Sequence, residues 1–429
     1  MVKKIILPNG TTVLLCPLKE TEAVTVLVDY KVGSRYETRE VGGVSHFIEH
    51  LMFKGTKRRP SSLAITRELD GVGAEFNAYT SKDHTAYYIK VVKEQMPLAL
   101  DILSDMLHRS LFKSEEINRE RGVIIEEIKM YEDNPMMHLG DYFDQCLYGD
   151  HPLGWSIAGT KEIIAGVPRE KILEYLQSHY HADRRIITVS GNFETRTALA
   201  LIKRHFGGRS MRDGAHEYVE AMPRNSRKAF VKHKDTQQVH MAMGTSAYPW
   251  GHPDAEAASL LSIIVGGTMS SRLFIQVRER KGLCYYIRAG LSSYTDTGDF
   301  TVTAGIDKAR VGLAIKTILS VLEGVRSKGV TKEELARAKE YIRGKITLEL
   351  EDSESVAAWY SKQYMFLGRM LTPQEKLKRF QSVTLKDIAR VAKSLLNTST
   401  YTLAVIGPYK DAKMFERLLK NSMIKACLR

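Results

Sequence analysis

The sequence has few cysteines, and they lie far apart along the chain. Only four occur among the 429 residues, namely Cys16, Cys146, Cys284 and Cys427, and no two of them form a C-x-x-C pair. This scatter argues against a disulfide framework and against a zinc site built from cysteines. We therefore expect the four residues to be buried or surface thiols.

Long hydrophobic runs are also missing. No window approaches the ~18–20 consecutive apolar residues that a membrane-spanning helix needs, although 43% of the residues are hydrophobic and 26% are charged. Residues 5–15 are two short strand-like runs around Asn9-Gly10, which predicts a hairpin rather than a signal peptide. We expect a soluble, cytoplasmic protein with no membrane partner, unless a transit peptide was removed earlier.

The charge is unbalanced but not concentrated. A net charge of +13 results from 63 Lys and Arg against 50 Asp and Glu. The basic residues are spread along the chain, and no basic tract is interleaved with aromatic residues as in many nucleic-acid-binding segments. We therefore expect no nucleic-acid partner. If a basic wall lines a cleft, it would instead attract acidic peptides.

The most informative stretch is His46-Phe47-Ile48-Glu49-His50. On a helix, residues three and four apart share a face, so His46, Glu49 and His50 form a stripe opposite an apolar one. Two histidines one turn apart can place ring nitrogens about 2.0–2.1 Å from one zinc ion, which leaves Glu49 free as a base. A random H-x-x-E-H has a probability on the order of a few per cent in such a chain. A third ligand is therefore needed to support a metal site.

Residues 114–131 predict a second helix that carries the missing ligand. Ser114 is a suitable N-cap, acidic residues follow it, and one side is apolar through Ile117, Ile124, Ile128 and Tyr131. Glu120 and Glu127 lie two turns apart at the border of that side, whereas Glu126 points away. A buried carboxylate needs a charged partner or a metal. Periodicity therefore favours Glu127 over Glu126, against the alternative of a solvated glutamate in a charged helix.

These motifs resemble the inverted zinc motif of the pitrilysin/insulysin superfamily. The chain is similar to the mitochondrial-processing-peptidase-like branch of that superfamily, nearly from end to end. Further matching segments are Phe53-Lys54-Gly55-Thr56, Phe76-Asn77-Ala78-Tyr79-Thr80-Ser81, His151-Pro152-Leu153-Gly154, Gly266-Gly267 and Gly282-Leu283-Cys284-Tyr285. The resemblance implies one zinc ion on His46, His50 and Glu127. It also implies Glu49 as the base and Glu120 as a second carboxylate that orients a ligating histidine.

The chain reads as two halves with a similar order of elements. Residues 24–34 form a strand-like run that leads to the helix of the histidine motif, and residues 239–246 lead to a helix at 255–265. The second helix is apolar where the first carries ligands, so only the first half can hold a metal. We predict an α+β fold in which each half is a sheet with helices packed on one side. The resemblance implies two homologous domains arranged like a clamshell.

The domain boundaries follow from one charged segment that contains glycine and proline. We predict an N-terminal zinc-binding peptidase domain at 1–210, a linker at 211–227, and a C-terminal metal-free domain at 228–429. The C-terminal domain is expected to contribute residues that bind the substrate.

Two segments are candidates for substrate contacts. Residues 76–90 have the composition of a strand, and an exposed edge there could bind an extended peptide as an extra strand. An ordinary sheet strand fits the same residues, and the resemblance assigns the substrate role to Asn77 and Ala78. His84 is expected to be a loop or surface residue, too far from other ligands to bind metal.

The second segment contains Arg278 and Tyr285. The resemblance implies that both reach the scissile peptide, where a guanidinium and a phenol can donate to the oxyanion or to substrate carbonyls. From the residues alone we would interpret them as a solvated arginine and a core tyrosine.

The combined hypothesis is a zinc metalloendopeptidase that hydrolyses peptides or unfolded precursor segments inside a closing chamber. The alternative is a catalytically idle scaffold, or a peptide-binding subunit of a heterodimeric processing peptidase. The chain is shorter than the four-domain members of the superfamily, so the resemblance implies a dimer. A homodimer with each site built across subunits is favoured because the chain carries both the zinc motif and the segment of Arg278 and Tyr285, and a heterodimer with a metal-free sister chain is the alternative. The ligand set also accepts Mn, Co or Fe.

Overall fold

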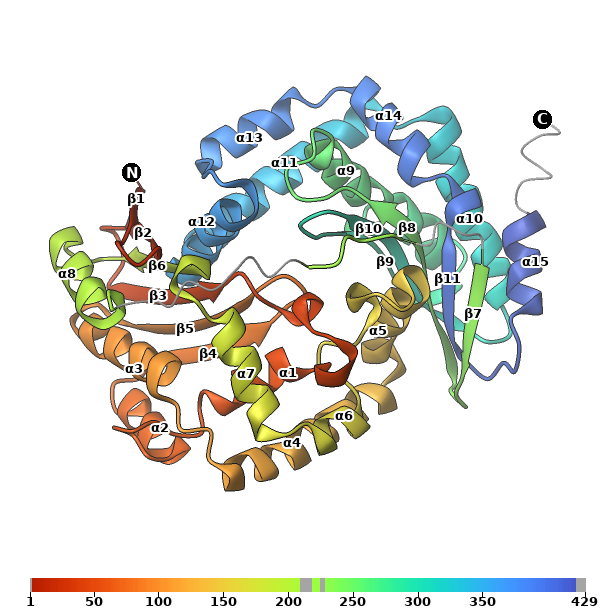
Figure 1. Cartoon of the computed structure of the whole chain (residues 1–429). Helices are drawn as coiled ribbons and strands as arrows, with labels where there is room; N and C mark the ends of the chain where they lie inside the picture. The colour runs from red at the N-terminus through yellow and green to blue at the C-terminus, as the bar shows by residue number, and fades with distance from the viewer. Residues whose placement is uncertain (1, 209–217, 224–227, 422–429) are drawn as a thin grey trace. The chain divides into compact units, whose positions relative to one another are not determined.

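The computed structural model describes residues 2–208, 218–223 and 228–421 (Figure 1). They form two compact units, each assembled from three segments. The first unit contains Met1–Lys129, Trp155–Val219 and Thr347–Leu371, and the second contains Met130–Gly154, Glu220–Ile346 and Thr372–Arg429. These units differ from the predicted contiguous domains 1–210 and 228–429. Each unit contains one segment from the other half of the sequence. Most of the predicted linker at 211–227 lies outside the described residues.

The first unit is built on a six-stranded sheet with the order β1-β2-β6-β3-β5-β4. The strands are β1 (Lys3–Ile6), β2 (Thr12–Pro17), β3 (Ala23–Tyr30), β4 (Glu75–Thr80), β5 (Thr85–Val92) and β6 (Arg185–Gly191). The predicted N-terminal hairpin is present, and Gly10 makes its turn at φ +93°, a conformation that favours glycine. Residues 76–90 are two strands of another hairpin, β4 and β5, rather than one strand.

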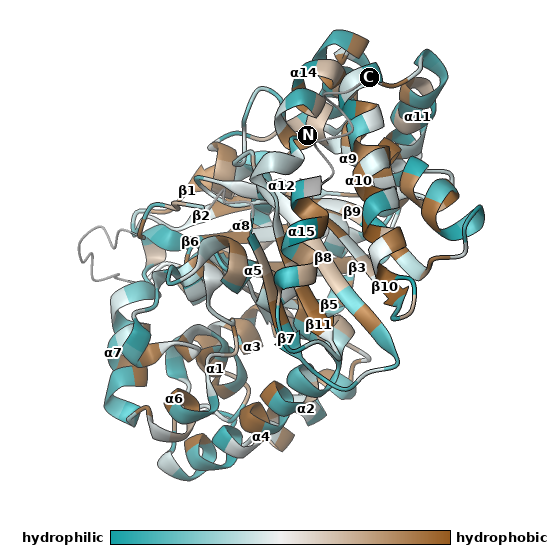
Figure 2. Ribbon diagram, turned by 90° about the vertical axis from the view of Figure 1, so that its right-hand side faces the viewer, coloured by the Kyte–Doolittle hydropathy of each residue, from teal (hydrophilic) through white to brown (hydrophobic). Residues whose placement is uncertain are grey.

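Alternate residues of this sheet face two different layers. On one face, Val13 and Val26 join the main core beneath helices α1 (Val44–Leu51) and α3 (Met96–Arg109). On the other face, Leu14 and Leu27 pack against helix α12 (Ser353–Leu367). The remaining helices of this unit are α2 (Ser62–Asp70), α4 (Ser114–Asp133), α6 (Lys161–Gly166), α7 (Arg169–His179) and α8 (Thr195–Phe206). Figure 2 shows hydrophilic residues along α4 and α7.

The second unit repeats this plan. Its sheet has the order β7-β11-β8-β10-β9, with the β7–β11 pair parallel and the others antiparallel, as in the series β2-β6-β3-β5-β4. The strands are β7 (Lys228–His233), β8 (Gln238–Ala247), β9 (Cys284–Ser293), β10 (Gly298–Asp307) and β11 (Thr402–Gly407). The helices include α5 (Pro135–Tyr148), α9 (Ala255–Ser262), α10 (Val311–Lys328), α11 (Lys332–Glu349), α13 (Pro373–Ser382), α14 (Leu385–Leu395) and α15 (Lys413–Asn421). The matching strand orders support the predicted duplication.

The two units exchange one helix each. Helix α5 comes from the first half of the sequence and packs in the second unit, where Leu139 and Phe143 contact Ala242 and Ala404. Helix α12 comes from the second half of the sequence and packs in the first unit. The helices that precede them, α4 and α11, each begin in one unit and end in the other. Each sheet is therefore covered on its second face by a helix from the other half.

The described residues contain three of the four cysteines. Cys16, Cys146 and Cys284 are free and buried, and Cys427 lies outside the described residues. Over the described ranges, no helix combines the length and the apolar character needed to cross a membrane.

Candidate metal centre

Helix α1 presents two histidines and a glutamate on one face because its other face is apolar. Its buried residues include Val44, Phe47, Ile48 and Leu51. The helix begins after Gly43, which has φ +94° and lies so close to the backbone of Ala158 that a Cβ atom would meet its oxygen at 2.7 Å. A residue with a side chain at this position would therefore be strained.

The N-terminus of α1 is held by a carboxylate that the sequence analysis missed. Glu37 accepts hydrogen bonds from the backbone N–H groups of Gly43 and Ser45, at 2.7 and 2.8 Å. Burial raises the pKa of Glu37 to about 7, although both hydrogen bonds favour the charged form. A glycine N-cap has no side chain to accept from these groups, and this was the one signal in the sequence that another acceptor was needed.

Three potential ligand atoms converge between α1 and α4. The Nε2 atoms of His46 and His50 each lie 3.7 Å from Oε2 of Glu127. Ligand atoms of the three residues all lie within 4.8 Å of one another, and no other such group of three occurs within the described ranges. A distance of 3.7 Å is too long for a hydrogen bond. It is close to the ~3.3 Å that separates two ligand atoms, each ~2.0–2.1 Å from a tetrahedral zinc ion.

The choice between adjacent glutamates of α4 follows from their exposure. The side chain of Glu126 is 71% exposed and pairs with Lys129, whereas that of Glu127 is 25% exposed. The apolar side of α4 contains Ile117, Ile124 and Ile128, as predicted. The prediction for Tyr131 was wrong, since this residue is 38% exposed. The buried cluster of the first unit includes Ile128 but not Tyr131, so the core beneath α4 ends before this residue.

The protonation states of the two histidines are set by their surroundings. Burial and the neighbouring His50 lower the pKa of His46 to about 3, which keeps its imidazole neutral as a metal ligand requires. Burial alone would lower the pKa of His50, but the hydrogen bond and charge of Glu120 raise it above its ordinary value. His50 Nδ1 lies 2.8 Å from Oε1 of Glu120, whose Oε2 accepts from Lys54 at 2.6 Å. His50 therefore turns Nε2 toward Glu127.

Glu49 lies on the same helix as the two histidines but outside the converging group. Burial raises its pKa, while a hydrogen bond donated by the Thr80 hydroxyl to Oε2 at 2.6 Å favours its charged form. Thr80 is the last residue of β4, so the edge of the sheet positions this carboxylate. The sequence analysis did not identify Thr80 as part of the site.

Two family models match the chain in succession. The model described as "Insulinase (Peptidase family M16)" matches residues 12–161, and the model described as "Peptidase M16 inactive domain" matches residues 166–342. This chain belongs to the M16 family of peptidases. The expected superfamily is thereby confirmed, and the mitochondrial-processing-peptidase-like branch stays a prediction.

Relatives of this M16 chain extend over nearly its whole length. The zinc protease YmxG of Bacillus subtilis is 34% identical over 95% of this chain and 98% of its own length. A zinc protease of Mycobacterium leprae is 34% identical over 96% of this chain and 93% of its own. The crystal structure of a protease from Helicobacter pylori superposes with a TM-score of 0.89 at 25% identity, and covers 95% of this chain and 99% of that one.

In this M16 chain, the residues expected to contact substrate occupy separate places. Asn77 and Ala78 lie on β4, the edge strand, opposite Tyr88 and Tyr87 of β5. Asn77 is exposed and Ala78 is buried, and the Asn77 side chain accepts the N–H of Ala78 at 2.9 Å. His84 was expected to be a loop or surface residue; it lies in the loop before β5, and it is buried rather than on the surface.

Arg278 and Tyr285 belong to the second unit, whereas the converging ligands belong to the first. The Arg278 guanidinium lies 4.7 Å from the ring centre of Phe274 and 5.8 Å from that of Tyr285. Tyr285 is 73% exposed, so it is not the core tyrosine that its residue type alone suggested. Tyr285 is thus exposed, whereas Arg278 is half-buried.

Proposed function

We propose that this chain is a zinc-dependent metalloendopeptidase that hydrolyses peptides or unfolded precursor segments. The observation that carries the proposal is the convergence of His46, His50 and Glu127 beside a separate carboxylate, Glu49. The names of the relatives, which call them zinc proteases, support the same conclusion. Three ligands from histidine and glutamate leave a position open for chemistry, unlike a closed structural site.

Each side chain of the proposed site has a separate role in hydrolysis. His46, His50 and Glu127 would hold the zinc ion, which would supply Lewis acidity and so help a water molecule to lose a proton near neutral pH. Glu49 accepts that proton and passes it to the leaving amine. The Thr80 hydroxyl keeps the Glu49 carboxylate in place through its hydrogen bond. Glu120 holds His50 so that Nε2, rather than Nδ1, is available to the metal.

The substrate is proposed to bind as an extended strand. Among the strands that the structure describes, β4 pairs only with β5, so its other edge can add a peptide through backbone hydrogen bonds, with Asn77 and Ala78 in its path. Arg278 and Tyr285 are proposed to donate to substrate carbonyls or to the developing oxyanion inside a closing chamber. The second unit would then contribute to catalysis without binding metal.

A homodimer is proposed as the active form, with a metal-free sister chain as the alternative. The chain carries both the ligands and the Arg278 segment, so two identical copies would contain all the proposed parts. Light scattering of the purified protein measures the mass directly. A dimer of this chain supports the homodimer, and a monomer that becomes active only with a second kind of chain supports the alternative.

The proposal is tested by cleavage of unstructured peptides with the zinc-loaded protein. Glu49→Gln keeps the ligands and removes the base, so it should retain zinc and lose cleavage by about 10²–10⁴-fold. Glu126→Gln is the matched control, because Glu126 is an exposed carboxylate next to a ligand, and it should cleave normally. Chelation should abolish activity. If zinc-loaded protein cleaves nothing, or if Glu49→Gln cleaves as well as the original protein, the proposal is wrong.

A further inference from the structure

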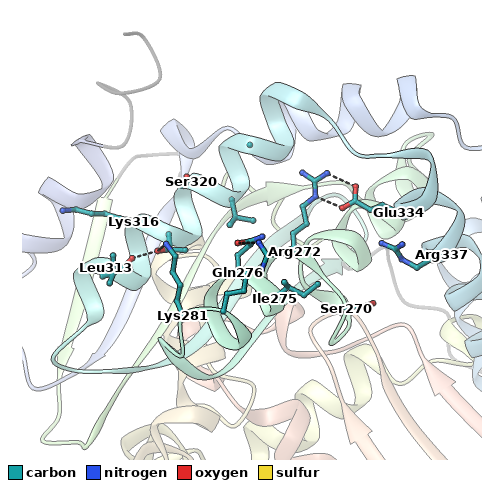
Figure 3. A pocket seen from close by; sticks show the side chains of 14 residues that line it. Ser270, Arg272, Ile275, Gln276, Lys281, Leu313, Lys316, Ser320, Glu334 and Arg337 are labelled. Carbon is teal, nitrogen blue, oxygen red and sulfur yellow. Dashed lines mark hydrogen bonds and ion pairs between the residues drawn. The ribbon is translucent and has the colours of Figure 1, made fainter. Parts of the chain in front are cut away.

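A basic cleft occupies one side of the second unit, which holds none of the three converging ligands (Figure 3). Its volume is about 700 Å³, and its walls come from the π-helical segment η7 (Phe274–Glu279) with its flanking residues, from α10 and from the start of α11. The charged side chains that line it are Arg272, Arg280, Lys281, Lys316, Arg337 and Glu334. The lining therefore has five cationic side chains and a single carboxylate.

Only one of these cations is neutralised within the lining. Arg272 donates to both carboxylate oxygens of Glu334 at 2.7 Å. Lys281 donates to the neutral hydroxyl of Thr317 at 3.3 Å. Lys316 and Arg337 are exposed, and neither has a carboxylate within salt-bridge distance among the residues that the structure describes. The cleft thus retains several positive charges that a ligand can neutralise.

The cations are spread along the cleft rather than aimed at one point. Figure 3 shows Lys281 and Lys316 toward one end and Arg272 and Arg337 toward the other, with Gln276 between them. A small anion is bound by donors that converge on it. Separated cations instead match a chain that carries carboxylates at intervals. Ile275 and Leu313 also line the cleft and offer apolar contact to the stems of glutamate side chains.

The cleft is distinct from the proposed substrate contact on the same segment. Arg278 is not part of the lining, and its guanidinium lies over the rings of Phe274 and Tyr285. Gln276 and Arg280, two residues before and after it, both line the cleft. The two faces of this segment therefore present different chemistry.

We propose that this cleft binds acidic polypeptide segments. The charge of the lining selects the ligand, and the spacing of the cations selects an extended chain over a single small anion. The assignment of that segment to a substrate chain rests on the proposed peptidase function. The cleft would then favour substrates that carry a run of glutamate or aspartate in addition to the cleaved bond.

The test is direct binding by the full chain carrying Glu49→Gln, which cannot cleave the probe. A fluorescein-labelled glutamate-rich peptide is compared with its glutamine analogue by fluorescence anisotropy. The cleft variant is Lys316→Gln/Arg337→Gln, and its matched control is Lys328→Gln/Lys345→Gln, with the same charge change on the same two helices. We expect the cleft variant to lose affinity for the acidic peptide by roughly fivefold, the contribution of two exposed ion pairs. The control should bind as the parent does.

Three outcomes would overturn this inference. One is equal affinity for the acidic and neutral peptides. Another is an equal loss in the control variant, because the attraction would then come from net charge alone. The third is displacement of the peptide by inorganic phosphate but not by chloride of the same ionic strength, which would indicate a small-anion site.

The binding test is separate from the test of peptidase activity. Cleavage of neutral peptides without selective acidic binding would leave the proposed function intact and remove the cleft proposal. Selective binding of the acidic peptide by a protein that cleaves no peptide would support the cleft proposal and remove the proposed peptidase function. If both hold, an acidic tail on a cleavable peptide should lower KM in the parent enzyme and not in the cleft variant.

Discussion

The Nδ1 atom of His50 lies 2.8 Å from Oε1 of Glu120, a carboxylate that is almost completely buried. With the Nδ1–H group donating to Glu120, the lone pair of Nε2 is directed to the place where Glu127 also points. Burial raises the pKa of Glu120, but hydrogen bonds from His50 and Lys54 outweigh this effect and hold the pKa below its usual value. Glu120 therefore favours its charged form, and its contact favours a proton on Nδ1 of His50.

Replacement of Glu120 should weaken zinc binding without removing a ligand. We expect Glu120→Ala to lower zinc affinity by about 10–100-fold, and Glu120→Gln to lower it less because its amide oxygen still accepts from His50. Competition with a chromophoric chelator measures both. Glu126→Gln on the same helix is the control and should bind as the original protein does. If Glu120→Ala binds zinc equally tightly, Glu120 does not orient the ligand.

Thr80 should affect the rate of the reaction rather than substrate binding. Thr80→Val removes the hydrogen bond that positions Glu49 and keeps the size of the side chain. We expect kcat to fall about tenfold, the effect of one hydrogen bond to a charged group, with KM nearly unchanged. Thr80→Ser keeps the hydroxyl and should restore most of kcat. A change confined to KM would contradict this role.

Glu37 should stabilise the start of α1. Glu37→Ala leaves the N–H groups of Gly43 and Ser45 buried without their acceptor, and we expect a loss of about 2–4 kcal/mol in the free energy of unfolding. Urea denaturation measures it. Glu40→Ala replaces a nearby exposed glutamate and should change stability by less than about 0.5 kcal/mol. Similar losses in both variants would show that the two hydrogen bonds contribute little.

Asp29 should make stability depend on pH in an identifiable window. Burial raises its pKa from 3.8 to about 6, while a hydrogen bond from Ser361 and the charge of Lys362 favour the ionised form. The native state therefore holds this proton more tightly than the unfolded state, so its contribution to stability falls as pH rises from about 4 to about 6. Asp29→Asn removes this loss and should be more stable than the original protein above pH 6, by up to about 3 kcal/mol.

The comparison for Asp29 must be made as a difference between the two proteins at each pH. Glu37 and Asp299 are also buried carboxyl groups whose pKa is raised by burial, to about 7 and about 6. Both contribute the same trend to the original protein and to Asp29→Asn, so they cancel in the difference. Urea denaturation at pH 4 and pH 8 provides the values. An equal difference at both pH values would show that Asp29 titrates normally.

The parts of the fold that follow local periodicity could be predicted from the sequence. The apolar stripe of α1 and the preference for Glu127 over Glu126 both follow from 3.6 residues per turn, and the structure shows the expected burial. The helix predicted at 255–265 begins at Ala255, the first residue of α9. The reading failed at Tyr131, because a pattern gives the face of a helix but not the point where the core beneath it ends.

The contacts that depend on tertiary placement could not be predicted. No local pattern marks Glu37 or Thr80 as part of the site. Their hydrogen bonds with Gly43 and Glu49 depend on how the folded chain places them. The position of α12 is a similar case. No local pattern of α12 says which sheet face it covers. Only the assembled structure shows that it covers Leu14 and Leu27 of the first sheet.

The exchange of α5 and α12 makes the two halves of the duplicated chain mutually dependent. If the first half were expressed without residues 347–371, one face of its sheet, including Leu14, Leu27 and Ala86, would be left open to solvent. The second half would lose the cover that α5 provides. We therefore expect each half to be less stable when it is expressed alone, because a cut at the linker does not follow the boundaries of the two units.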